Sequence, residues 1–176
     1  MRWRLLLFRL PAEPSRHRVA VWRELRRTGA VTVGPSVWLV PATSAFEEGI
    51  ARASELVVRG GAEPLLLEVE PSDEAGGTRL GALYTAARED EWQELLTECG
   101  RYLAELDREI AKEKFTPAEL DEEEQSMERL RRWYREIRLR DVLGAPSTSA
   151  AENRLKECEA HLEHYTQLVF RHAHDA

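Results

Sequence analysis

The arginines between residues 15 and 28 are the side chains whose type and spacing best fit a chemical task. Arg16, Arg23 and Arg27 recur at spacings of seven and four residues, which places them on one face of a helix. Guanidinium groups in such a row can donate hydrogen bonds to successive phosphate oxygens of a nucleic acid. The other interpretation is a solvated helix face, on which arginine stems shield apolar neighbours. The candidate DNA-binding residues are Arg16, Arg18, Arg23, Arg26 and Arg27.

Sulfur and imidazole groups form a second, weaker candidate site near the C-terminus. Cys158, His161 and His164 follow one another at spacings of three residues. A Cys or His pair at such spacing can share a metal ion. Cys158, however, falls on an apolar stripe, and no second ligand pair with zinc-like spacing is present. We therefore predict no metal site. Cys158 and His161 are the only weak candidates for ligands. We expect Cys99 and Cys158 to be buried, reduced thiols.

Catalytic signatures are missing from the sequence. There is no nucleophile elbow, no phosphate-binding glycine loop and no Cys-x-x-Cys pair. The acidic run at residues 121–124 follows a helix start and is interpreted as a solvated acidic face. We therefore expect a protein that is not an enzyme and that needs no cofactor.

Composition and charge describe a soluble protein with two unlike halves. The chain has 176 residues, of which 43% are hydrophobic and 32% charged. Residues 1–62 carry ten arginines against five glutamates, which gives a net charge of +5. Because the whole chain has a net charge of −7, the remaining residues carry a net charge of −12. This asymmetry favours two surfaces with different partners or, alternatively, halves that neutralise one another across an interface.

The location expected from the sequence is the cytoplasm. No apolar run approaches the roughly 20 residues of a membrane helix, so we expect no membrane association. The apolar stretch after Arg4 ends at Arg9, which is too short for a signal peptide.

The pattern of residues 3–70 predicts a strand, a helix, two strands, a helix and a strand. Ser15 is expected to cap the first helix, 15–28, and Gly29 to end it, with Val21, Trp22 and Leu25 as its apolar stripe and Val19 beside them. The strands at 3–10 and 37–40 are apolar on both faces, whereas those at 30–33 and 64–70 alternate. Central strands one and three and edge strands two and four are typical of the ferredoxin-like βαββαβ arrangement.

The rest of the chain is predicted to be helical. Residues 71–78 are the expected linker. They are followed by helices at about 79–113, 117–143 and 149–172, the first of them with an expected break near residues 89–90 and the second opened by Thr116 and Pro117. The predicted fold is therefore α+β, with a ferredoxin-like domain at 1–72 and an antiparallel helical domain of about three long helices at 79–176. The uncovered face of the sheet and the long helices favour a homodimer.

Several short motifs in the first forty-one residues recur in one known family. They are Arg18-Val19, Trp22-Arg23 with Leu25, Gly29-Ala30, Val37-Trp38 and Pro41. On these motifs residues 3–70 resemble the N-terminal domain of ChrB proteins, and the acidic half resembles it more loosely. The resemblance implies a chromate-responsive transcriptional regulator whose N-terminal part binds promoter DNA. ChrB proteins usually carry a further C-terminal domain associated with sensing chromate, and this chain is expected to be a standalone homologue without it.

The expected strand order is also similar to that of the small dimeric nucleases of CRISPR systems and of a related domain in phenylacetate-type repressors. Those nucleases hold a metal with an Asp at the end of the first strand. Here that strand ends in Phe8-Arg9-Leu10, without a carboxylate, so we expect no metal-dependent cleavage of phosphodiesters.

Three functional hypotheses follow. The leading one is a ChrB-like regulator, or a regulatory accessory in chromate resistance, that contacts double-stranded DNA through its arginine-rich first helix. The alternative is a non-enzymatic interaction module whose basic face meets an acidic protein. The third is a protein that handles a metal or an oxyanion in chromate metabolism. Steeply salt-dependent binding to duplex DNA distinguishes the first from the second.

Overall fold

The computed structural model describes residues 1–175, which divide between Ala87 and Arg88 into two compact units. The first unit contains β1 (Trp3–Leu7), α1 (Ser15–Thr28), β2 (Val31–Gly34), β3 (Val37–Pro41), a 3-10 turn η1 (Ser44–Phe46), α2 (Glu47–Arg59) and β4 (Leu65–Val69). Helix α3 (Glu74–Ala111) begins in the first unit and continues into the second, which also holds α4 (Pro117–Arg140) and α5 (Thr148–Asp175). The mixed α+β class expected from the sequence is confirmed.

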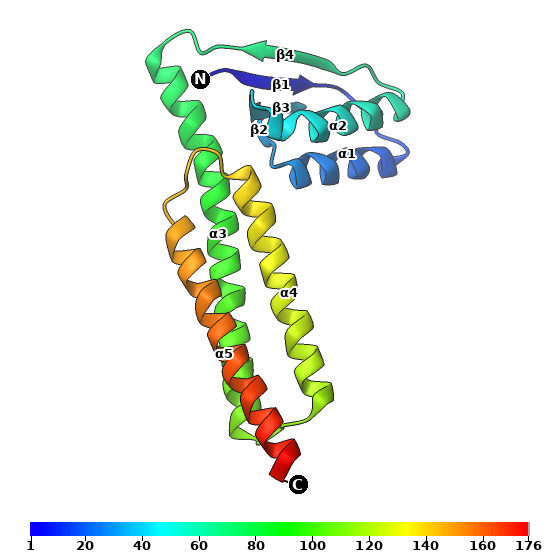
Figure 1. The fold of residues 1–176 in the computed structure, drawn as a ribbon. Coiled ribbons are helices and arrows are strands. Elements are labelled where there is room, and N and C mark those ends of the chain that lie inside the picture. The colour runs from blue at the N-terminus through cyan, green and yellow to red at the C-terminus, as the bar shows by residue number, and fades with distance from the viewer. Residues whose placement is uncertain (176) are drawn as a thin grey trace. The chain divides into compact units, whose positions relative to one another are not determined.

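The strands form one antiparallel sheet in the order β2-β3-β1-β4. Strand β1 pairs with both β3 and β4, so that Leu5 lies opposite Leu39 on one side and opposite Leu67 on the other. Helices α1 and α2 lie side by side on the same face of the sheet (Figure 1). The prediction that the first and third strands are central is confirmed, and it explains why these strands are apolar on both faces.

Helix α1 has the predicted bounds, but its buried face is narrower than expected. Val21 and Leu25 are fully buried, whereas Trp22 is 53% and Val19 41% exposed. Because Trp22 lies about 100° around the helix from Val21, a face centred between Val21 and Leu25 leaves it outside. The prediction of Ser15 as cap is also wrong, since Pro14 occupies the N-cap position and no side chain caps the helix.

The exposure of the side chains of strand β4 differs from the prediction. Its alternating pattern suggested that one face would be buried, yet Leu65, Leu66 and Leu67 are 52%, 49% and 39% exposed. Strand β4 stands at the edge of the sheet, and β1 is its only partner strand in the described chain. An edge strand that carries exposed leucines is a potential site of association.

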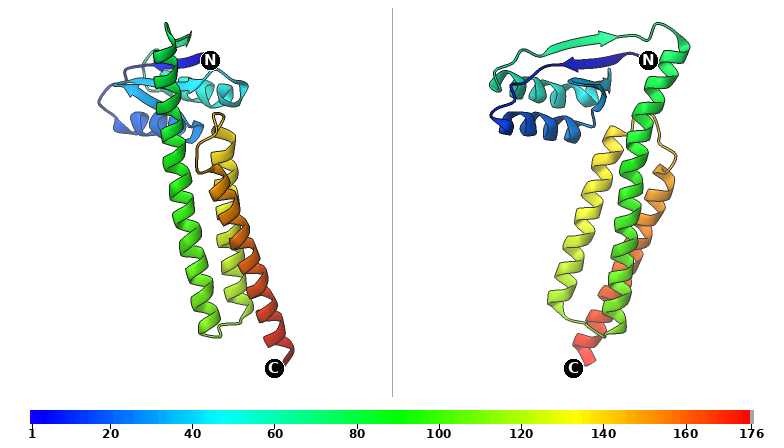
Figure 2. Two further views of the ribbon diagram at one scale, coloured as in Figure 1. Left: turned by 90° about the vertical axis from the view of Figure 1, so that its left-hand side faces the viewer. Right: turned by 180° about the vertical axis from the view of Figure 1, so that it is seen from behind.

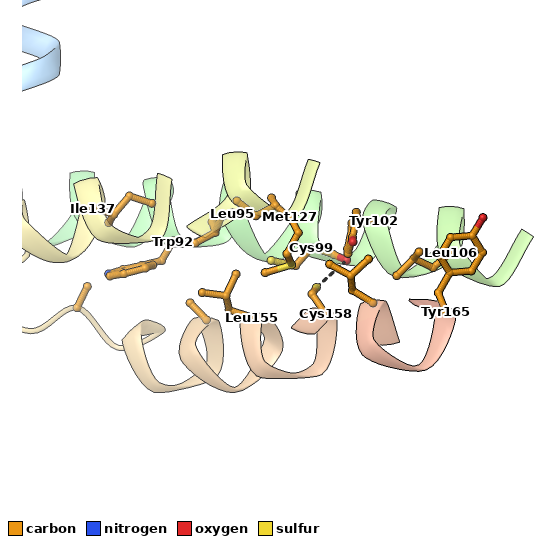
Figure 3. Close-up of a cluster of buried hydrophobic side chains, with 14 of the residues drawn as sticks. Trp92, Leu95, Cys99, Tyr102, Leu106, Met127, Ile137, Leu155, Cys158 and Tyr165 are labelled. Atoms are coloured by element: carbon orange, nitrogen blue, oxygen red, sulfur yellow. Dashed lines mark hydrogen bonds between the residues drawn. The ribbon is translucent and has the colours of Figure 1, made fainter. Parts of the chain in front are cut away.

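The core of the second unit comes from one apolar stripe on each of its three helices. Figure 3 shows Trp92, Leu95 and Leu106 of α3 facing side chains of α4 and α5. All five residues predicted for the last stripe are buried: Leu155, Cys158, Leu162, Tyr165 and Val169. Thr116 caps α4 as predicted, because its Oγ1 accepts a hydrogen bond from the N–H of Glu119 at 3.3 Å. The three helices run beside one another in both further views (Figure 2).

Helix α3 differs from its predicted bounds at its start and in its continuity. It begins at Glu74, inside the segment expected to be a linker, and it runs through residues 89–90 without a break. Asp73 starts it locally, since its Oδ1 accepts a hydrogen bond from the N–H of Gly76 at 2.6 Å. This side-chain acceptor offsets the low helix propensity of Gly76 and Gly77.

Asp141 organises the connection between α4 and α5. Its carboxylate is buried and accepts hydrogen bonds from Trp92 Nε1 at 2.9 Å and from Thr148 Oγ1 at 2.7 Å. The backbone N–H groups of Gly144 and Ala145 donate to the same carboxylate, each at 3.0 Å. Four donors from three segments thus converge on one buried charge, which fixes the chain as it turns.

Among the described residues, no helix combines sufficient length with sufficient apolar character to cross a bilayer.

Candidate nucleic-acid interface

The surface proposed from the sequence is the outer face of α1. Arg16, Arg18, Arg23, Arg26 and Arg27 are all exposed. The helix ends where predicted, at Gly29, whose φ of 87° is the left-handed conformation that glycine adopts without strain. The end of α1 lies close to α2 at Gly49, where any Cβ would collide with the side chain of Thr28. This contact holds the arginine-bearing face outward.

The arginines of this face fall into two groups. The side chains of Arg16, Arg18 and Arg23 make no ion pair or hydrogen bond with any residue in the described part of the chain. Arg27 is different, because its Nη2 donates to Glu24 Oε2 at 2.7 Å. The structure thus keeps the first three guanidinium groups available for a ligand, whereas Arg27 shares its charge with a carboxylate.

Glu24 links α1 to α2. Besides Arg27, it receives a hydrogen bond from Arg52 Nε at 2.9 Å, and Arg52 also pairs with Glu48 on its own helix. Burial works to raise the pKa of Glu24, but the hydrogen bonds from Arg27 and Arg52 outweigh it and hold that pKa below its ordinary value. Arg52 thereby adds a guanidinium group from the second helix beside the row. No pattern in the sequence indicates Arg52 as part of this surface, because α2 has no row of arginines.

The exposed Trp22, which the sequence pattern had placed on the apolar stripe, is a second unpredicted feature of this surface. The guanidinium carbon of Arg26 lies 5.8 Å from the centroid of the Trp22 ring, a cation–π geometry. With Val19, the indole forms an apolar strip within the basic surface. Trp and Arg are enriched among the residues that contribute most to affinity at protein interfaces, so an exposed Trp beside an Arg is characteristic of a binding surface.

The two weak candidates for metal ligands, Cys158 and His161, lie in different environments. Cys158 is fully buried, and its thiol donates to the carbonyl oxygen of Cys99 at 3.6 Å. The His161 side chain is 43% exposed, and its Nε2 lies 3.8 Å from a carboxylate oxygen of Asp107. No group of three or more potential ligands suited to a metal ion is found within residues 1–175. The thiol therefore belongs to the core, as its place on the apolar stripe suggested.

A groove of about 1120 Å³ runs between α3 and α4 of the second unit. Its lining includes Asp90, Glu94, Glu98, Glu105 and Glu123, with Arg101, Arg129, Leu130, Tyr102 and Trp133 among the rest. Glu123 belongs to the acidic run expected to be solvated, and for this residue that expectation is wrong, since it is only 7% exposed. The O–H of Tyr102 donates to the backbone carbonyl of Glu123 at 3.1 Å and holds this turn of α4 against α3.

Glu123 makes the stability of the chain depend on pH. Burial, reinforced by the carboxylates of Glu105 and Glu109, raises the pKa of Glu123 to about 7. Below the unfolded value of about 4.3 the carboxyl is protonated in both the folded and the unfolded chain and has no effect on stability. As the pH rises from there towards 7, the fold loses stability, because the unfolded chain ionises Glu123 more readily than the folded one does.

Glu123→Gln should therefore stabilise the chain by about 1–2 kcal/mol at pH 8, after allowance for water in the groove, and by little at pH 4. Urea unfolding at the two pH values measures this difference. The exposed neighbour Glu124, replaced by Gln, is the matched control and should change little at either pH. Equal stability of the wild type and Glu123→Gln at pH 8 would contradict the prediction.

These observations define the class of protein. It is an α+β protein that carries an arginine-bearing helix on its sheet and a second unit of three helices. The family model described as "Protein ChrB, N-terminal" matches residues 18–176, and the chain belongs to this family. The family makes it a chromate-resistance-related protein. A search of curated proteins finds no match to the chain. The match includes the acidic helical unit, which the sequence motifs had related to the family only loosely.

Proposed function

We propose that this protein is a cytoplasmic, non-enzymatic regulator in chromate resistance that contacts double-stranded DNA through α1. The observation that carries the proposal is the exposed set of Arg16, Arg18 and Arg23, whose guanidinium groups have no carboxylate partner among the described residues. Membership of the ChrB family supports a role in this pathway. The strand order and the position of both helices on one face of the sheet support a ferredoxin-like assignment for the first unit.

Contact with phosphates is the mode that α1 suits best. The helix lies flat on its sheet, so it offers the side of a cylinder rather than an end that could enter the major groove as a recognition helix does. Arginines along that side can donate to several phosphates of one strand. The expected binding is therefore strong at low salt and only weakly dependent on base sequence.

The test is fluorescence anisotropy with duplex DNA from the region upstream of the protein's own gene, at two salt concentrations. Micromolar or tighter binding with a steep loss of affinity at the higher salt concentration is the expected result. Absence of binding by the wild type at low salt would reject the proposal.

A protein partner is the second candidate, and the exposed Trp22 and Val19 favour it specifically. Phosphate contacts make no use of an indole ring, whereas protein interfaces concentrate Trp and Arg. An acidic partner protein would bind with a shallower salt dependence than DNA, and Trp22→Ala would then weaken binding more than the loss of one arginine.

The chain is also expected to form a homodimer through the exposed edge strand β4. Replacing Leu65 and Leu67 by Lys should convert a particle of twice 20.2 kDa into a monomer, because charged side chains disfavour pairing at a sheet edge. Light scattering at micromolar concentration measures the mass. Leu139 and Phe170, exposed at 73% and 58% on the other unit, are the control pair for Lys substitution. A wild-type mass of 20.2 kDa would exclude the dimer.

A further inference from the structure

The groove between α3 and α4 combines negative charge with an apolar wall. Asp90, Glu94 and Glu98 stand four residues apart on α3, so their side chains follow one another at about 6 Å along the helix axis. Glu98 is paired with Arg101, and the guanidinium group of Arg129 donates to Ser126 Oγ at 3.3 Å. With Glu105 and Glu123, the groove has five acidic side chains against two basic ones.

At the end of this groove near Glu105, one acceptor lacks a partner. Glu123 is 7% exposed and lines the groove, yet its carboxylate accepts no hydrogen bond and forms no ion pair with the residues described. The residue is largely buried, but its carboxylate oxygens are not among the fully buried atoms that lack a partner, so they face the water of the groove. An arriving cation that can donate hydrogen bonds would replace that water and pair with a carboxylate that is poorly solvated.

We propose that this groove binds an aliphatic polyamine, with one ammonium group hydrogen-bonded to Glu123 and another paired with the carboxylates of Glu94 and Glu98. The ammonium groups of such a molecule are separated by short methylene chains, so that one molecule can pair with carboxylates on different helical turns of the groove lining. The methylenes would pack on Leu130 and Trp133, and the indole ring also attracts a nearby ammonium group. A metal ion fits this groove less well, since no suitable ligand cluster occurs within residues 1–175.

Binding by this route is linked to proton release. Charged or titratable groups interact with Glu123 from all three helices: Tyr102, Glu105 and Glu109 on α3, Glu119 and Glu122 on α4, and Tyr165 on α5. Burial and the carboxylates among them raise the pKa of Glu123 to about 7, so the carboxyl is mostly protonated at pH 6 and mostly ionised at pH 8. An ammonium group needs the ionised form, and affinity should therefore rise with pH through this range.

The experiment is an NMR titration of the full-length, nitrogen-15-labelled chain with 1,5-diaminopentane at constant ionic strength, at pH 6 and pH 8. Both amines keep their charge over this range, because alkyl amines titrate near pH 10. Saturable shifts are expected at the backbone amides of residues 94–105 and 123–133. The dissociation constant should be about tenfold larger at pH 6, in proportion to the ionised fraction of Glu123.

Two variants and one ligand separate the proposal from non-specific attraction. Glu123→Gln keeps the shape of the side chain and should remove the pH dependence and weaken binding at pH 8. Glu136→Gln, an exposed residue of the same helix outside the groove, should bind as the wild type does. n-Pentylamine, which lacks the second ammonium group, should bind more weakly.

Three results with the two amines would overturn the proposal. These are no saturable shifts at millimolar diamine, an unchanged titration of Glu123→Gln, and equal binding of pentylamine. A lysine-rich peptide that saturates the groove where the diamine does not would likewise overturn it, in favour of a protein partner.

Discussion

Replacing Arg16, Arg23 and Arg27 together by Ala is expected to weaken binding to duplex DNA by roughly a hundredfold at 0.1 M salt, since each phosphate contact contributes about 1 kcal/mol or more. The three residues lie on one face of α1 and are exposed. The slope of the logarithm of affinity against that of salt should become shallower by up to about three, roughly one for each lost contact. Because Arg27 shares its charge with Glu24, its part of this change should be the smallest.

The matched control removes the same charge from the acidic unit. Arg132, Arg138 and Arg171 are exposed there, and their joint replacement by Ala should leave DNA binding almost unchanged. Circular dichroism should show both triple variants folded, because exposed arginines contribute little to stability. Wild-type affinity in the α1 variant would remove this helix from the mechanism. Loss of preference at one base position would instead indicate a contact with a guanine edge.

Asp141→Ala is expected to lower the free energy of unfolding by about 3–5 kcal/mol, since it leaves several buried donors without an acceptor. Trp92 Nε1 and Thr148 Oγ1 lose their partner, as do the N–H groups of Gly144 and Ala145. Urea denaturation followed by circular dichroism measures the change. Asp121, exposed near the start of α4, is the control, and its replacement by Ala should cost less than about 0.5 kcal/mol.

The same residue should contribute to acid unfolding. Burial acts to raise the pKa of Asp141, but the hydrogen bonds from Thr148 and Trp92 outweigh it, and the pKa lies below its ordinary value. A lowered carboxyl pKa stabilises the fold at pH values above the unfolded value of about 3.9, and this stability is lost as the pH falls through the folded pKa. The stability difference between the wild type and Asp141→Ala should therefore shrink at acid pH. A difference that stays constant down to pH 2 would show that the charge of Asp141 is unimportant.

Features set by neighbouring residues were predictable from the sequence. The end of α1 at Gly29 and the capped start of α4 at Thr116 follow from the dihedral preferences and hydrogen bonds of a few adjacent residues. The buried stripe of α5 follows from helical periodicity alone. The central position of β1 and β3 was also predictable, because a strand that is apolar on both faces is more often found inside a sheet than at its edge. The family was recognisable from the short motifs around Trp22 and Trp38.

Features that depend on contacts between distant residues were decided by the tertiary structure alone. Arg52 reaches Glu24 across 28 positions, and Trp92 reaches Asp141 across 49. The exposure of Trp22 and the burial of Glu123 run against their residue types. Helical geometry fixes which residues share a face, but only packing against other segments fixes which face meets the core and which meets water. For this reason the sequence alone determined the arginine row of α1, whereas its ion pairs and the groove around Glu123 emerged only in the folded chain.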